Sequence, residues 1–275
     1  MAKPILAIMY DFDKTLSTTD MQNYTFIPMM GLTPEEFWGR TGEFSKKTGC
    51  ERILSYMYMM IAIARERGIE LTREFLRSCG KSVKYHPGVT TWFQRINEIG
   101  AAKGVKVEHY LVSSGTKEIV EGCSIYECFD KVYGCEFYYE NGLPVWPKLA
   151  INYTQKTQYF FRIAKGVINT KDDDNVNKKT EELRIPYENI AYIGDGMTDV
   201  ACMTLVNKNG GYSIGVYTDS NKESVAQIRK DKRCRFVVKA DYSQNSDMEK
   251  VFSLIIDDIA NRTILQNKEK ALAEK

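Results

Sequence analysis

The feature that most restricts the fold is a short apolar run that ends abruptly at two acids. Residues Ile5–Tyr10 are apolar at every position, and Asp11 and Asp13 follow at once. A strand without polar alternation is buried on both faces, as strands of parallel sheets are. Further strand candidates alternate with helical segments, at Val105–Val112, Ile190–Ile193, Tyr212–Val216 and Arg235–Val238. This alternation predicts an α/β fold with a doubly wound, mostly parallel, Rossmann-like sheet.

One long stretch departs from this rhythm. Residues 17–85 contain no segment with strand periodicity, and Thr33-Pro-Glu-Glu36 has the cap residue, N1 proline and acids of a helix start. Arg52–Arg67 and Thr72–Lys81 also have helical patterns, and His86-Pro-Gly interrupts the chain. We therefore expect a helical cap domain at residues 17–85, inserted into an α/β core formed by residues 1–16 and 86–275.

The second half of the chain has three further local signals. Lys131–Trp146 alternates and turns at Asn141-Gly142, which predicts a β-hairpin. Thr154–Lys165 is helical by pattern, with Thr154 as a candidate N-cap. Lys171–Lys179 is polar and predicts a loop or a capped helix start, and the charged tail after Asn261 is expected to fray.

Composition excludes several classes of function. The 275 residues carry a net charge of +2, which predicts no broad field for nucleic acid or an anionic membrane. The basic residues between Arg229 and Arg235 are best explained as a solvated helix end. The longest apolar run outside the first strand, Met57–Ala64, is too short to span a bilayer, and no targeting segment is recognisable. The seven scattered cysteines lack zinc spacing and predict free thiols in a cytoplasmic protein.

Two groups of acids follow predicted strands. The segment Asp11-Phe-Asp-Lys-Thr-Leu16 fails as a calcium loop, because Leu16 stands where that loop needs Gly and Gln22 where it needs Glu. It fits either a simple turn or a site, as does Gly194-Asp-Gly-Met-Thr-Asp199. If the two strands are neighbours, four carboxylates converge and repel one another unless a cation or proton intervenes. A set of oxygen ligands with little His or Cys favours Mg²⁺.

Two further segments fit a phosphate site, although each has an ordinary alternative. Ser113-Ser-Gly-Thr116 ends a strand and opens a helix, where hydroxyls and free N–H groups suit either a phosphate or a helix cap. Lys156 falls near the start of a helix, where a cation opposes the helix dipole. Taken alone, Lys156 is expected to be a surface lysine. The acids and a phosphate, however, would need a compensating positive charge, which Lys156 could supply.

These four segments, in this order, resemble the motifs of the haloacid dehalogenase-like superfamily across nearly the whole chain. The first motif resembles Asp-x-Asp-x-Thr at Asp11, Asp13 and Thr15, and the second an apolar strand ending in Ser113. The third is similar to Lys156 opening a helix, and the fourth to Gly-Asp-Gly-x-x-Asp at Gly194 to Asp199. A helical insert after the first motif and the later hairpin resemble the phosphoserine-phosphatase-like branch.

The resemblance implies a Mg²⁺-dependent phosphatase that hydrolyses a small phosphomonoester. It implies that Asp11 attacks phosphorus, and that Asp13 protonates the leaving group and then activates water. Asp11, the carbonyl of Asp13 and Asp195 are implied as Mg²⁺ ligands. Ser113, Ser114 and Lys156 are implied to bind the phosphoryl group. Asp199 is implied to anchor the site by pairing with Lys156, with Thr198 beside it.

Three departures put phosphoserine itself in doubt. Thr198 replaces a usual Asn, Lys14 a frequent Ser, and Asp20 stands where that branch has a Glu that reads the amino group. Asp20 is therefore expected either to contact the substrate or to cap the first cap helix. The alternatives for the whole protein are a phosphotransferase using the same intermediate and a non-enzymatic switch module phosphorylated on Asp. The expected partner is a small phosphorylated metabolite, not nucleic acid or membrane.

Overall fold

A seven-stranded sheet forms the centre of the molecule. The computed structural model describes residues 3–180 and 182–274, and its strand order is β4-β3-β2-β1-β5-β6-β7. The strands are β1 (Ile5–Tyr10), β2 (Lys106–Thr116), β3 (Lys131–Glu140), β4 (Leu143–Leu149), β5 (Ile190–Gly194), β6 (Tyr212–Tyr217) and β7 (Phe236–Lys239). All neighbours pair in parallel except β3 and β4. The predicted doubly wound, mostly parallel α/β fold is confirmed.

The first strand lies in the middle of the sheet. β1 pairs with β2 on one side, Tyr10 opposite Leu111, and with β5 on the other, Tyr10 opposite Ile193. Five of its six residues are buried, as expected for a strand covered on both faces. The strand order reverses its direction of growth at β1, and such a switch point opens a crevice at the carboxyl ends of the strands.

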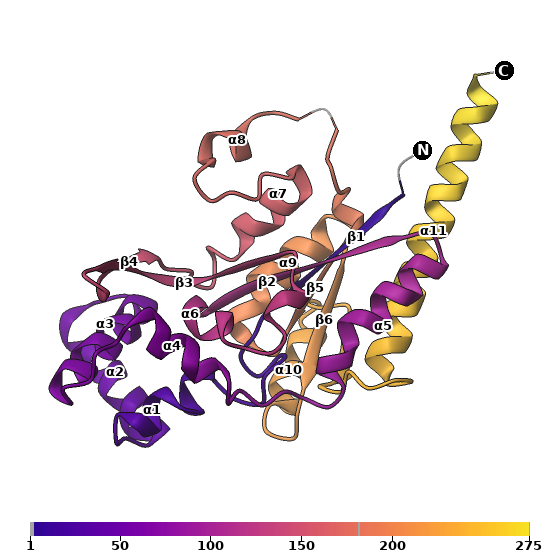
Figure 1. Cartoon of the computed structure of the whole chain (residues 1–275). Coiled ribbons are helices and arrows are strands. Elements are labelled where there is room, and N and C mark those ends of the chain that lie inside the picture. The colour runs from indigo at the N-terminus through magenta and orange to yellow at the C-terminus, as the bar shows by residue number, and fades with distance from the viewer. Residues whose placement is uncertain (1–2, 181, 275) are drawn as a thin grey trace.

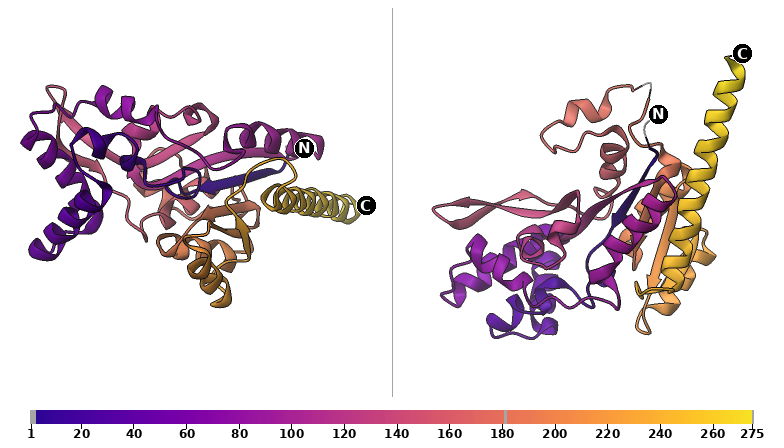
Figure 2. Two further views of the ribbon diagram at one scale, coloured as in Figure 1. Left: turned by 90° about the horizontal axis from the view of Figure 1, so that it is seen from below. Right: turned by 45° about the vertical axis from the view of Figure 1, so that its right-hand side comes forward.

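Helices cover both faces of the sheet (Figures 1 and 2). α5 (Val89–Ala102) and α11 (Asp247–Ala273) pack together, whereas α7 (Thr157–Lys165) packs with α9 (Val200–Lys208). Right-handed crossovers that run in opposite directions along the sheet place α5 and α9 on opposite faces. α10 (Lys222–Lys230) is the next helix after α9 in the chain and packs on β6 and β7. The short elements are α6 (Lys117–Glu121), α8 (Asp173–Asn177), η2 (Tyr126–Cys128), η3 (Tyr187–Asn189) and η4 (Met197–Asp199).

A helical unit lies between β1 and α5, beneath the β3–β4 hairpin in Figure 1. It contains η1 (Met21–Asn23), α1 (Phe26–Met29), α2 (Pro34–Thr48), α3 (Arg52–Glu66) and α4 (Arg73–Gly80). The predicted helix start at Thr33 is present: its side chain accepts the N–H of Glu36, and the two residues form a reciprocal capping box. The chain leaves and returns at one point, because Ser17 and Tyr85 form an isolated bridge. We retain 17–85 as the proposed extent of the cap domain, and 1–16 with 86–275 as that of the core.

Several boundaries differ from the sequence predictions. β2 continues to Thr116, beyond the predicted end at Val112, and α7 begins at Thr157 instead of Thr154. Residues 262–273 of the tail, which was expected to fray, continue α11, which projects from the body (Figure 1). The predicted hairpin is present, with Asn141 (φ 51°) and Gly142 (φ 81°) both in the left-handed region that a tight hairpin turn requires.

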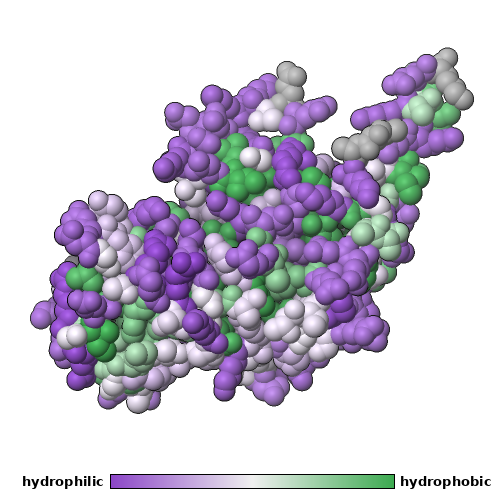
Figure 3. All heavy atoms as spheres, viewed as in Figure 1, coloured by the Kyte–Doolittle hydropathy of each residue, from purple (hydrophilic) through white to green (hydrophobic). Residues whose placement is uncertain are grey.

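The surface in Figure 3 is mainly hydrophilic, with scattered hydrophobic residues. In the part of the chain that the structure describes, no helix combines the length and apolar character needed to cross a membrane.

Candidate active site

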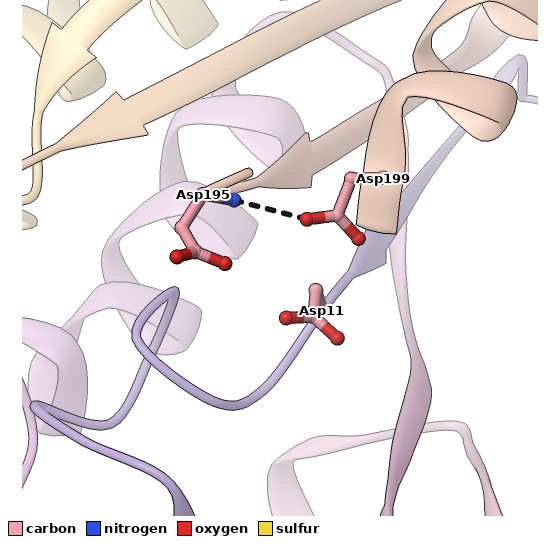
Figure 4. A group of neighbouring side chains, drawn as sticks. All are labelled: Asp11, Asp195 and Asp199. Atoms are coloured by element: carbon pink, nitrogen blue, oxygen red, sulfur yellow. Dashed lines mark hydrogen bonds between the residues drawn. The ribbon is translucent and has the colours of Figure 1, made fainter. Parts of the chain in front are cut away.

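The carboxyl ends of β1 and β5 bring three acids together. Asp11 directly follows β1, and Asp195 directly follows β5. The backbone N–H of Asp11 donates to the carbonyl of Ile193 at 2.9 Å, which extends the pairing of the two strands by one residue. Asp199 joins them from η4, so that oxygens of Asp11, Asp195 and Asp199 lie within 4.8 Å of one another (Figure 4). The two acidic segments therefore face each other across adjacent strands.

Lys156 supplies the positive charge of this cluster. Its side chain is 1% exposed, and its Nζ lies 2.6 Å from Asp11 Oδ1 and 2.9 Å from Asp199 Oδ1. Lys156 is therefore not the solvated surface lysine that its position in the sequence suggests when taken alone. Burial by itself lowers the pKa of Lys156, but the two carboxylates outweigh it and raise that pKa, so the ammonium stays charged. Lys156 is the N-cap residue of α7, directly before Thr157, and its backbone N–H donates to Asn152 O at 3.2 Å.

Asp199 is held by a complete set of hydrogen bonds. Besides Lys156, Oδ1 accepts the hydroxyl of Tyr192 at 2.7 Å, and Oδ2 accepts the N–H groups of Asp195 at 3.1 Å and Gly196 at 3.3 Å. A Cβ on Gly194 would lie 2.4 Å from Asp199 Cγ, so only glycine permits this approach. Thr198 Oγ1 lies 3.4 Å from Asp199 Oδ2. Asp199 is therefore a fixed anchor for the lysine.

Asp13 lies on the turn that follows β1. Its Oδ1 accepts the backbone N–H of Met21 at 2.7 Å, which connects the turn to the start of the cap. Burial, together with the charges of Asp20 and Asp11, raises the pKa of Asp13 well above its ordinary value. The turn itself places Lys14 at φ 60°, a left-handed conformation that is uncommon for a residue with a side chain.

The two serines at the end of β2 differ in their surroundings. Ser113 is buried, and its Oγ accepts the N–H of Gly115 at 2.9 Å. Ser114 lines the cleft with the acids and Lys156, and its buried Oγ has no hydrogen-bond partner among the described residues. The cleft has a volume of about 270 Å³, and its lining includes Ser114 but not Ser113. The geometry favours Ser114 as the serine that meets a ligand.

Asp20 lies at the edge of the cleft in an ion pair. Its carboxylate is 2.8 Å from Lys14 Nζ, and it makes no side-chain capping bond to η1, although it occupies the N-cap position. The capping alternative thus has no hydrogen bond to support it. Asp20 also lines the cleft, so a contact with substrate remains a prediction.

The carboxylate oxygens of these acids are the kind of ligand atom that a divalent cation requires. Burial and the neighbouring Asp199 raise the pKa of Asp195 to about 8, and for Asp11 burial outweighs Lys156 and gives a pKa of about 6. Carboxylates that resist ionisation together are those that a bound cation would stabilise. Asp199 is already occupied by Lys156, Tyr192 and two N–H groups. Asp11 and Asp195 are left as the oxygen donors that fit Mg²⁺.

Comparison with known families decides the wider assignment. The model of the haloacid dehalogenase-like hydrolase family matches residues 8–204, which include all four polar segments. The chain belongs to this family. The predicted superfamily and the prediction of a hydrolase are both confirmed.

Individual relatives of this haloacid dehalogenase-like hydrolase are distant. An uncharacterized protein of Borreliella burgdorferi is 27% identical, over 93% of this chain and 96% of its own. A family hydrolase of Salmonella enterica serovar Typhi superimposes with a TM-score of 0.59 at 13% identity, covering 91% of this chain and 71% of its own. A phospho-aspartyl intermediate analogue of phosphoserine phosphatase gives 0.54 at 16% identity, covering 92% and 99%. The two structures show a shared fold, including that of the phosphoserine-phosphatase-like branch.

Sequence reasoning missed several residues that shape the site. Tyr192, which orients Asp199, is hidden in a strand whose pattern indicates only burial. Tyr192 is the one residue of that strand with a polar side-chain group, and this was the only sign in the sequence that it takes part in the site. Gln22 and Tyr56 come from the cap and line a cavity that adjoins the cleft, and because tertiary packing brings them there, no local pattern could have found them.

Proposed function

We propose that this hydrolase is a Mg²⁺-dependent phosphatase that cleaves a small phosphomonoester through a phospho-aspartate intermediate on Asp11. The observation that carries the proposal is the buried ion pair of Asp11 with Lys156, at 2.6 Å, at the end of the central strand. The lysine neutralises part of the charge that a carboxylate and a phosphate dianion would otherwise bring together. The second oxygen of Asp11 lies 3.4 Å from Thr15 Oγ1 and is the candidate attacking atom.

In the first step, an Asp11 oxygen forms a bond to phosphorus while the bond from phosphorus to the leaving oxygen breaks. Asp13, whose raised pKa favours its protonated form, gives its proton to that leaving oxygen. In the second step, Asp13 as a carboxylate takes a proton from water, whose oxygen attacks phosphorus and displaces Asp11. The products are an alcohol and inorganic phosphate, and both aspartates return to their starting forms.

The remaining residues hold the phosphoryl group while its charge redistributes. Lys156 and the N–H and hydroxyl of Ser114 are the donors proposed for the phosphoryl oxygens, and Ser113 supports the turn through Gly115. Asp199 fixes Lys156, and Thr198 lies beside it. Mg²⁺, held by Asp11, Asp195 and the carbonyl of Asp13, would offset the charge of the phosphate. We further propose a cytoplasmic enzyme acting on a small phosphorylated metabolite.

The proposal is tested by phosphate release from a panel of small phosphomonoesters with Mg²⁺. We expect turnover by the wild-type protein, none by Asp11→Asn, and a severe loss with Asp13→Asn, which still has the nucleophile. Circular dichroism of each variant controls for folding. Turnover by Asp11→Asn at the wild-type rate would reject the nucleophile, and phosphate transfer to added alcohols without release to water would indicate a phosphotransferase.

A further inference from the structure

A second cavity adjoins the catalytic cleft on the side where a leaving group must lie. Its volume is about 440 Å³, and it shares Asp13, Asp20 and Ser114 with the cleft. Its other walls come mainly from the cap, on η1, α2 and α3. Asp13, the proposed proton donor to the leaving oxygen, stands between the two spaces. The cavity is therefore where the part of the substrate beyond the phosphoryl group would be held.

This cavity contains most of the unsatisfied buried polar atoms of the described chain. Five buried side-chain atoms lack a hydrogen-bond partner in residues 3–180 and 182–274, and three of them belong to cavity-lining residues: Gln22 Oε1, Thr41 Oγ1 and Ser114 Oγ. Gln22 is 2% exposed and Thr41 is 6% exposed. Buried polar atoms without partners are costly and rare in folded proteins. Three of the five atoms therefore belong to residues around one space, which favours a ligand with hydrogen-bonding groups there.

The orientation of Gln22 specifies what kind of group it needs. The Thr116 hydroxyl donates to the sulfur of Met60 at 3.7 Å, so its oxygen is free to accept the Gln22 amide N–H at 3.4 Å. This arrangement uses the nitrogen of the Gln22 amide and leaves its oxygen unpaired. An amide oxygen can only accept a hydrogen bond. In this orientation Gln22 favours a ligand that presents a donor such as a hydroxyl.

The rim of the cavity carries two cations. Lys46 and Arg52 are exposed on its rim, and neither forms an ion pair with any residue in the described ranges. The acids of the lining are Asp13, the proposed proton donor, and Asp20, which Lys14 already neutralises at 2.8 Å. Two free cations beside a neutralised acid favour an anion and disfavour an ammonium group.

The apolar part of the lining is rigid. The ring of Trp38 is held by a hydrogen bond from its Nε1 to Asn23 Oδ1 at 3.1 Å, and Tyr56 donates from its hydroxyl to the Ser114 carbonyl at 2.7 Å. Ile53 completes this wall. Fixed apolar walls with a few placed polar groups are typical of small-molecule sites, and they can pack against a carbon chain or a sugar face.

We propose that the leaving group is a hydroxyl-bearing carbon skeleton with a carboxylate of its own, as in a phosphorylated sugar acid, with Gln22 accepting from a hydroxyl and Arg52 and Lys46 facing the carboxylate. The inference rests on the proposed phosphatase function and names its substrate class. Such a leaving group is larger than that of phosphoserine and carries no ammonium.

The test compares two probes that differ in charge at the far end, 6-phosphogluconate and glucose 6-phosphate, with phosphoserine as a third. We expect wild-type kcat/KM for 6-phosphogluconate to exceed that for each of the other two at least about tenfold. The Arg52→Gln variant should reduce this preference over glucose 6-phosphate to within about threefold. Gln22→Met should lower kcat/KM for both sugar phosphates relative to phosphoserine, because it removes the acceptor. Lys47→Gln, a change at an exposed neighbour outside the cavity lining, is the matched control and should preserve the preference.

A preference for phosphoserine, or one between the sugar phosphates that Arg52→Gln leaves unchanged, would overturn the inference while leaving the phosphatase proposal intact. If none of the three probes is turned over although another phosphomonoester of the panel is, the inference is wrong. If no phosphomonoester at all is turned over, the phosphatase proposal fails instead. Calorimetric titration of the same probes into wild type and Arg52→Gln then still decides the substrate class. Tighter binding of 6-phosphogluconate that depends on Arg52 supports it, and equal binding of both sugar phosphates contradicts it.

Discussion

At the scale of single residues, the site depends on how closely chemical groups can approach Asp199. Its carboxylate fits against the backbone of Gly194 with no room for a side chain, and it holds Lys156 at 2.9 Å. The lysine in turn contacts Asp11. The proposed nucleophile is thus oriented by a chain of contacts that begins at a glycine on another strand. Any atom added at that glycine must displace Asp199.

We therefore expect Gly194→Ala to impair activity and stability together. The added Cβ would lie 2.4 Å from Asp199 Cγ, and overpacking of this kind costs about 1–3 kcal/mol. Gly196→Ala is the matched control, because a Cβ there has open space within 4 Å. Urea unfolding and phosphate release measure the two effects. Equal behaviour of both variants would show that the close contact does not hold the site.

The residues of the site were predictable to the extent that they occur in local patterns. Asp11, Asp13, Asp195 and Asp199 follow short apolar strands, so the sequence places them at a sheet edge. The burial of Lys156 was not predictable, because a lysine near a helix start has the same pattern whether solvated or enclosed. Its environment is created by strands far away in the chain.

At the scale of elements, β2 is tied to the segment before β5 by a buried acid. Glu108 on β2 accepts from Arg184 Nη1 at 2.8 Å, from Tyr110 at 2.6 Å and from Lys106 at 2.8 Å. Burial by itself raises the pKa of Glu108, but these hydrogen bonds outweigh it and lower the pKa to about 2. The carboxylate is therefore favoured in the folded state.

This lowered pKa predicts the acid sensitivity of the sheet. The folded-state pKa lies below the value of the unfolded chain, so the stabilisation is present above the unfolded pKa. It is lost as the pH falls toward the folded value of about 2. Glu108→Gln should lower the melting temperature at neutral pH and flatten its decline between about pH 5 and pH 3. Melting curves across this range check it. A variant with the same acid dependence as wild type would assign that dependence to other groups.

Element types were more predictable than their ends. The hairpin turn at Asn141-Gly142 and the helix start at Thr33 are local in origin, and both are present as predicted. The end of β2 and the start of α7 are set by tertiary contacts. β2 continues to Thr116 because Cys135 of β3 pairs with it there, and Lys156 stays outside α7 while it reaches the acids.

At the scale of the whole molecule, the topology places a polar cleft between the sheet and the helical unit inserted after β1. The doubly wound, mostly parallel type of sheet could be inferred from the chain, because alternating strands and helices form few topologies. The packing of α2 and α3 around the cavity beside the cleft could not, because no pattern in the sequence encodes how helices far from the motifs meet the sheet. The cavity next to Asp13 is therefore a finding of the structure alone.

The metal proposal also concerns the whole fold, because a ligand that binds only the folded state stabilises it. At a Mg²⁺ concentration about 100 times its Kd, the free energy of unfolding should rise by about 2.7 kcal/mol. The site would form only when β1 and β5 are paired, so this gain should appear as a higher melting temperature. We expect Asp195→Asn to abolish most of the gain and excess chelator to reverse it. Equal Mg²⁺ stabilisation of wild type and variant would place the ion elsewhere.

The central claim is a covalent bond between Asp11 and phosphorus, and chemical trapping of that bond tests it most directly. The enzyme is mixed with a phosphomonoester that it turns over, quenched in acid and reduced with borohydride, which converts a phosphorylated aspartate to homoserine. We predict homoserine at position 11 in the digested protein, and none in the Asp11→Asn variant or without substrate. Modification of a different residue, or rapid turnover with an unmodified Asp11 under conditions that trap a known phospho-aspartate, would contradict the account.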